Sequence, residues 1–175
     1  MKTSMVAPLL LSAAAFTVAI AAFLLALDDR GGDDGGRVVT TGPLSGYEVE
    51  KPVLFERDEF FLVRHPDLDG GLVSFSALYR VVPHIYFGVE KGCQVRWEPD
   101  TSFDANGTTY AGIFDDPCSG SKFTVDGKRL FGPASRDLDQ FLAIQVPGTD
   151  NATIDTRVLL CSNSAQPCMR TLAER

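Results

Sequence analysis

Residues 116–141 read DPCSGSKFTVDGKRLFGPASRDLDQF. Within this stretch, Asp126-Gly127 separates two short runs with apolar residues, 122–125 and 128–130. An Asp-Gly pair in this setting is a strong hairpin signal, because glycine adopts a positive φ angle at no steric cost. The stretch therefore predicts two antiparallel strands joined by a turn.

Short apolar runs separated by turn residues continue on both sides of this hairpin. They lie at residues 60–63, 72–82, 94–97, 109–114, 141–146 and 153–160. The 16 glycines and 10 prolines supply many turns, and no internal repeat is visible. Many short strands at this spacing predict an all-β fold, an antiparallel sandwich or barrel.

The composition is that of one ordinary folded domain. The chain has 175 residues, of which 45% are hydrophobic and 22% charged, so a disordered tail and a collagen-like repeat are excluded. The formal net charge is -7, which argues against the basic surface of a nucleic-acid binder. We therefore expect no nucleic-acid partner.

The N-terminus has the length and composition of a membrane span. Residues 6–27 form an uncharged, mostly apolar run of 22 residues, preceded by Lys2 and followed by Asp28, Asp29 and Arg30. About 20 apolar residues cross the hydrocarbon core as a helix. The charges favour a cytoplasmic N-terminus. We expect a single-pass anchor at 1–30 that contacts the lipid bilayer through 6–27; a signal peptide cleaved near residues 19–21 is the alternative.

A Gly/Asp-rich segment follows the expected anchor. Residues 31–36 read GGDDGG, a composition that cannot build a core and is typical of a flexible tether. We expect a tether at 31–46 and an extracytoplasmic domain at 47–175, which is long enough to bury one core.

Four cysteines lie in this domain, at positions 93, 118, 161 and 168. An even number outside the cytoplasm suggests disulfides, with three possible connectivities. The simplest joins the near neighbours Cys161 and Cys168 and leaves Cys93 to pair with Cys118. A metal site is disfavoured, because the chain has no Cys-x-x-Cys and only two histidines, His65 and His84.

The stretch at 116–141 resembles the second cluster-binding loop of Rieske iron–sulfur proteins. That family reads Cys-Pro-Cys-His-Gly-Ser, a turn, Gly-Pro-Ala and Leu-x-x-Phe, and this chain has Asp-Pro-Cys-Ser-Gly-Ser at 116–121 and Gly-Pro-Ala at 132–134. Upstream, Val-Pro-His at 82–84 and Gly-Cys-Gln-Val-Arg-Trp at 92–97 are similar to the family's first loop. An anchor followed by a glycine-rich tether is also the layout of membrane-bound Rieske subunits of cytochrome bc-type complexes.

The resemblance implies a Rieske-like fold whose ligand set is degenerate. A Rieske [2Fe–2S] cluster is held by two Cys and two His. These ligands fall on Val82, His84, Asp116 and Ser119, so a single histidine is kept and both thiolates are missing. Residues around 85–91 are extra, and another register, with first ligands at Gly88 and Glu90, loses all four. The family's loop disulfide falls on Cys93 and Cys118.

We therefore expect no [2Fe–2S] cluster, no other metal and no catalytic residues. His84, Asp116 and Ser119 superficially resemble a hydrolase triad, but no nucleophile elbow is visible. The expected function is an accessory subunit, not an enzyme, bound to the membrane subunits of a cytochrome bc-type or related electron-transfer complex. Its domain would lie on the periplasmic side of a bacterial plasma membrane. The alternatives are an electron carrier with unusual ligation and a free-standing extracytoplasmic enzyme or binding domain.

Overall fold

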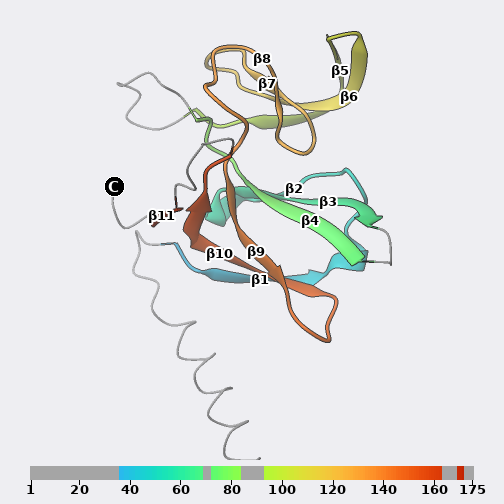
Figure 1. The fold of residues 1–175 in the computed structure, drawn as a ribbon, viewed down its shortest axis with the longest axis vertical. Helices are drawn as coiled ribbons and strands as arrows, with labels where there is room; N and C mark the ends of the chain where they lie inside the picture. The colour runs from blue at the N-terminus through green and yellow to red at the C-terminus, as the bar shows by residue number, and fades with distance from the viewer. Residues whose placement is uncertain (1–35, 69–71, 84–92, 163–168, 172–175) are drawn as a thin grey trace, which may run out of the picture. The chain divides into compact units, whose positions relative to one another are not determined.

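The computed structural model describes residues 36–68, 72–83, 93–162 and 169–171. All of them belong to one compact unit that spans residues 35–175. Within this unit, two antiparallel sheets carry the fold (Figure 1). The expected antiparallel all-β class is confirmed, and the larger sheet curls into a half-barrel.

The larger sheet has seven strands. Its path is β1 (Val38–Pro43), β10 (Asn151–Leu160), β9 (Gln140–Gln145), β4 (Leu72–Tyr79), β3 (Phe60–Leu68) and β2 (Val53–Phe55), while β11 (Met169–Thr171) also pairs with β10. Two short 3₁₀ turns, η1 (Leu44–Gly46) and η2 (Glu56–Asp58), follow β1 and β2. Every strand pair of this sheet is antiparallel.

The smaller sheet has four strands in sequence order. They are β5 (Arg96–Ala105), β6 (Thr108–Asp115), β7 (Lys122–Phe123) and β8 (Arg129–Phe131). The expected hairpin around Asp126-Gly127 is confirmed, because β7 pairs with β8 and Gly127 has a φ of 81°. A second hairpin joins β5 to β6 at Asn106-Gly107, where both residues have positive φ, as a two-residue primed turn requires.

The apolar side chains of β3 alternate between two hydrophobic cores. Phe60 and Leu62 belong to the core of the half-barrel, while Phe61 and Val63 belong to the core between the two sheets. Side chains that follow one another along a strand point to opposite faces, so a strand covered on both faces is apolar throughout. This explains why the run at 60–63 shows no polar alternation.

Strand β1 lies inside the segment expected to be a tether. Val38 to Thr40 pair with β10, and Val39 is buried in the half-barrel core. The expected domain boundary at residue 47 is therefore too late, since the sheet already includes Val38. Two adjacent valines beside a run of glycines and aspartates are too short a pattern to predict a strand.

The expected anchor, residues 1–30, lies outside the described residues. In the part of the chain that the structure describes, no helix is both long and apolar enough to cross a bilayer.

Candidate functional site

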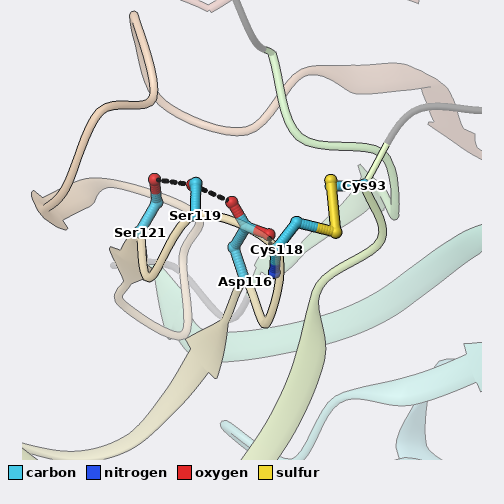
Figure 2. The surroundings of a disulfide bond; sticks show 5 residues. All are labelled: Cys93, Asp116, Cys118, Ser119 and Ser121. Carbon is cyan, nitrogen blue, oxygen red and sulfur yellow. Dashed lines mark hydrogen bonds between the residues drawn. A yellow bond between two sulfur atoms is a disulfide. The ribbon is translucent and has the colours of Figure 1, made fainter. Parts of the chain in front are cut away.

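A disulfide between Cys93 and Cys118 joins the two loops that the sequence analysis singled out. It links the segment before β5 to the turn after β6, with 6.0 Å between the two Cα atoms (Figure 2). Cys93 is buried in the core between the sheets, whereas Cys118 is exposed. The prediction of this pair is confirmed.

The segment that carries Cys93 is also held by backbone hydrogen bonds. The Val82 amide donates to the Cys93 carbonyl at 2.8 Å, and the Val95 amide donates to the Arg80 carbonyl at 2.9 Å. Residues 80–82 and 93–95 thus lie side by side. Val82, on which the resemblance places a family ligand that this chain lacks, is 4% exposed and packs in the same apolar core as Cys93. An aliphatic side chain there fills space and offers no ligand atom.

Asp116, on which the resemblance places the family's second ligand cysteine, is fully buried and organises the turn that carries Cys118. Its carboxyl oxygens accept the Cys118 amide hydrogen at 2.9 Å and the hydroxyl hydrogen of Ser119. Its own amide and carbonyl bond to Ser121 and Gly120 within the same turn. Figure 2 shows the carboxyl group between the Cys118 amide and Ser119. Asp116 is therefore a capping residue of this loop.

A hydrogen bond also joins this turn to the Gly-Pro-Ala segment at 132–134. The Ser121 hydroxyl accepts the Ala134 amide hydrogen at 3.0 Å and is also hydrogen-bonded to Ser119 at 2.9 Å. Gly132 has a φ of 96°, and a Cβ atom there would overlap the Ser121 backbone. Only glycine allows this approach, which explains why a glycine stands here.

The structure brings three of the four positions that were expected to be degenerate to this corner of the fold. Asp116 and Ser119 are hydrogen-bonded to each other, and Val82 is linked to the turn through Cys93 and the disulfide. The fourth position, His84, lies outside the described residues, as does the extra segment at 85–91.

The donor set at this corner is already engaged. Among the described residues, one group brings together three side chains of the kinds that ligate metals, namely Cys93, Asp116 and Cys118, with ligand atoms within 4.8 Å of one another. Both sulfur atoms are covalently joined, and the Asp116 oxygens accept hydrogen bonds from the turn. While the disulfide is intact, the sulfur atoms and the Asp116 oxygens hold the loop together, and neither sulfur is a thiolate that could bind a metal.

The remaining predicted disulfide involves Cys161. Cys161 is disulfide-bonded, while its predicted partner Cys168 lies outside the described residues. Trp97, the last residue of the 92–97 stretch, is partly buried and lies against Phe114 with 5.0 Å between ring centroids.

A separate pocket of about 550 Å³ was not foreseen from the sequence. It is lined by residues of β3, β4 and β9 and by the loops around 126–128 and 137–138. His65 lies in it and shares a 2.8 Å hydrogen bond with Ser76. Burial lowers the pKa of His65 below 6.5, against the opposing charges of Asp126 and Glu50. No local motif marks these residues, because they come from distant parts of the chain.

Comparison with known proteins adds no relative: the chain matches no protein-family profile and no curated protein.

Proposed function

We propose that this chain is a membrane-anchored accessory subunit of a respiratory or photosynthetic electron-transfer complex, built on a Rieske-like domain that has lost its cluster. The anchor at 6–27 would pack among the membrane subunits of a cytochrome bc-type or related complex. The domain would lie on the periplasmic side of a bacterial plasma membrane, where its loops contact a neighbouring subunit.

One observation carries the proposal. The disulfide joins the loops of Cys93 and Cys118, a hydrogen bond fastens them to the Gly-Pro-Ala segment, and Asp116, where the resemblance would put a cluster thiolate, is used inside the turn. A buried carboxyl group that accepts local hydrogen bonds orders the loop without a metal. The scaffold is therefore compatible with a role in binding after the loss of redox chemistry.

The disulfide supplies stability that does not depend on iron. It closes a separation of 25 residues, which contributes about 3–4 kcal/mol to the free energy of unfolding in the chain-entropy description. Together with the Asp116 hydrogen bonds, this crosslink accounts for how such a loop region could keep its fold without a cluster.

The decisive experiment is purification of the full-length chain from its native membranes in a mild detergent. The proposal predicts that a haem-bearing membrane complex co-purifies in a fixed ratio, measured by partner identification and a haem absorption spectrum on one sample. Elution of the chain alone, without haem or partners, would contradict the role as a subunit.

Iron analysis and electron paramagnetic resonance of the separated, reduced chain test the loss of the cluster. We expect iron at background level and no Rieske-type signal. Stoichiometric iron with such a signal would establish the rival function, an electron carrier with unusual ligation. As a matched control, His84→Ala should leave co-purification unchanged, whereas loss of an iron signal in that variant would identify His84 as a ligand.

A further inference from the structure

The side chains of Cys93, Cys118 and Asp116 lie close enough together to share one metal ion. Their ligand atoms lie within 4.8 Å of one another, which no other three such side chains among the described residues achieve. Zinc–ligand bonds of about 2.0–2.3 Å place the ligand atoms of a tetrahedral site about 3.3–3.8 Å apart. The group therefore has the dimensions of a metal site, and the bond between the two sulfur atoms is what keeps a metal out.

The carboxyl group of Asp116 is held in position beside the two sulfur atoms. It is fully buried, and it accepts hydrogen bonds from the Cys118 amide at 2.9 Å and from the Ser119 hydroxyl. A carboxylate has about four lone-pair sites, so it can accept these hydrogen bonds and bind a cation at the same time. Hydrogen bonds of this kind orient the ligands of metal sites and strengthen metal binding. The turn thus presents one ligand group that is already oriented.

The two sulfur atoms become metal ligands whenever the disulfide is open. A newly made chain carries Cys93 and Cys118 as thiols, because the disulfide forms by a later oxidation. In the oxidised chain, a dithiol reductant transfers two electrons and two protons to the S–S bond, becomes a disulfide itself and leaves two thiols. Rotation about the Cα–Cβ bonds then lets the sulfur atoms move apart while the Cα atoms stay 6.0 Å from each other.

This set of donors selects zinc. Thiolates are soft ligands that favour Zn²⁺, whereas Mg²⁺ and Ca²⁺ prefer oxygen atoms, and Zn²⁺ has no redox change that would oxidise the thiolates again. Two thiolates and one carboxylate fill three positions of a tetrahedron and leave the fourth to a water molecule. Water can reach the site from the side of Cys118, which is exposed, while Cys93 lies in the apolar core.

We propose that the reduced chain binds one Zn²⁺ through Cys93, Cys118 and Asp116, with a water molecule at the fourth position. Each thiol releases one proton as it binds, so one zinc displaces two protons. The ion joins the same two segments that the disulfide joins, the one before β5 and the turn after β6. The zinc-bound and the disulfide-bonded states exclude each other, because both use the same sulfur atoms.

The zinc site is independent of the proposed association with membrane subunits. It needs only three side chains of this chain, whereas co-purification with a haem-bearing complex needs a partner and no zinc. Each of the two proposals can therefore fail without the other.

Zinc content after reduction tests the site directly. The sample is the full-length chain in detergent micelles with Cys161→Ser and Cys168→Ser, so that Cys93 and Cys118 are its remaining cysteines. A phosphine, present together with zinc, reduces the disulfide to two thiols and takes up the oxygen of one water molecule. Alkylation and mass spectrometry of a zinc-free aliquot count these thiols. After unbound metal is removed, we expect one zinc per reduced chain and none per oxidised chain.

Cobalt gives a second readout, which wild type also provides if the serine variant does not fold. Co²⁺ takes the place of Zn²⁺ in thiolate sites, and its visible absorption reports tetrahedral coordination by sulfur. Reduced wild type should develop this absorption, and added Zn²⁺ should remove it. Circular dichroism checks that each sample is folded.

Two neighbouring aspartates give a matched pair of variants. Asp116→Asn keeps the shape of the side chain and an acceptor for the Cys118 amide, but it removes the charged ligand. Asp115→Asn makes the same change in a carboxylate that pairs with Lys122 outside the group. Zinc affinity should fall more than about tenfold in Asp116→Asn, since even a group that only orients a ligand is worth about 10–100-fold. It should stay unchanged in Asp115→Asn.

Three results would overturn the proposal. One is a chain that retains no zinc after its reduction in the presence of zinc. Another is equal zinc content in the oxidised and the reduced chain, which would place the metal on other groups. The third is equal weakening of zinc binding in the two aspartate variants, which would show that Asp116 is not a ligand.

Discussion

Asp116 stabilises the loop by accepting two hydrogen bonds while it is fully buried. Asp116→Ala would remove the buried acceptor of the Cys118 amide and of the Ser119 hydroxyl. We expect the free energy of unfolding to fall by about 1–3 kcal/mol, which chemical denaturation followed by circular dichroism can measure.

The neighbouring Asp115 is a matched control for this variant. Its carboxylate pairs with Lys122 in a partly exposed position. Asp115→Ala should therefore cost less than about 1 kcal/mol, the usual size of a surface ion pair. Equal losses in the two variants would refute the capping role of Asp116.

The residue His65 makes stability depend on pH. Its pKa is lowered by burial from 6.5, so the unfolded chain takes up a proton at a higher pH than the folded chain does. Below a pH of about 6.5, His65 therefore favours the unfolded state increasingly, until the pH reaches the folded pKa.

Thermal denaturation between about pH 7 and pH 5 measures this effect. His65→Gln should flatten the decline of stability with falling pH, because the variant has no imidazole to protonate. His84→Gln is the control with the same chemical change. An identical pH profile for wild type and His65→Gln would contradict the assignment.

At the scale of elements, two turns both contain a glycine with a positive φ angle, but the space around the two glycines differs. Gly132 and Gly148 both have positive φ angles, but a Cβ at Gly132 would overlap Ser121, whereas nothing lies within 4 Å of one at Gly148. Gly148→Ala should cost about 1 kcal/mol from backbone strain alone. Gly132→Ala should cost clearly more, because the turn and the Gly-Pro-Ala segment must separate.

The midpoints of urea denaturation of the two variants test this difference. Similar midpoints would mean that the contact between Gly132 and the turn contributes nothing beyond the φ requirement.

The contribution of the disulfide between the two loops to stability can be measured directly. Replacing Cys93 and Cys118 together by Ser should lower the free energy of unfolding by about 3–4 kcal/mol, because the unfolded chain regains the entropy of a 25-residue separation. Denaturation of the double variant beside wild type in oxidised form measures the loss. A change below about 1 kcal/mol would show that the hydrogen bonds of the turn suffice to hold it.

Most strands could be predicted from local patterns, but those that depend on distant pairing could not. The run at 60–63 and the Asp126-Gly127 turn carry their own signals in adjacent residues. Strand β1 is formed by pairing with β10, more than 100 residues later, which no local window contains. The Asn106-Gly107 hairpin also has a local signal, since Asn-Gly favours primed turns.

The candidate sites likewise include features that the sequence predicts and features that only the folded structure shows. The pairing of Cys93 with Cys118 could be inferred from cysteine spacing and from the family resemblance. The capping role of Asp116 could not, because it depends on how deeply the turn is buried. The pocket beside His65 required the meeting of two sheets, which a linear pattern does not contain.

At the scale of the whole molecule, β3 ties the two sheets together. Phe61 from the half-barrel packs against Phe114 of the smaller sheet, with 4.9 Å between ring centroids, while its neighbours Phe60 and Leu62 fill the half-barrel. The two cores cannot be lost independently when one strand supplies both. We expect a single cooperative unfolding transition of this unit.

Two probes test the cooperativity. Trp97 is the chain's single tryptophan and lies in the smaller sheet, so its fluorescence should change together with the far-ultraviolet circular dichroism of all strands. Phe61→Ala should lower the free energy of unfolding by about 3–5 kcal/mol with both probes, and the exposed Phe131→Ala by much less. Separate transitions for the two probes would show that the sheets unfold independently.

The unequal burial of the two bridged cysteines sets a direction for thiol exchange. An incoming thiolate reaches the exposed Cys118 first, so the mixed disulfide forms there and Cys93 is the leaving group. Cys93 must then depart as a thiolate into an apolar core, an environment that raises the energy of the anion. A thiolate can therefore attack the disulfide at Cys118, but the departure of Cys93 is slow. Reduction of the disulfide should be slow while the core is intact and rapid once the sheets separate.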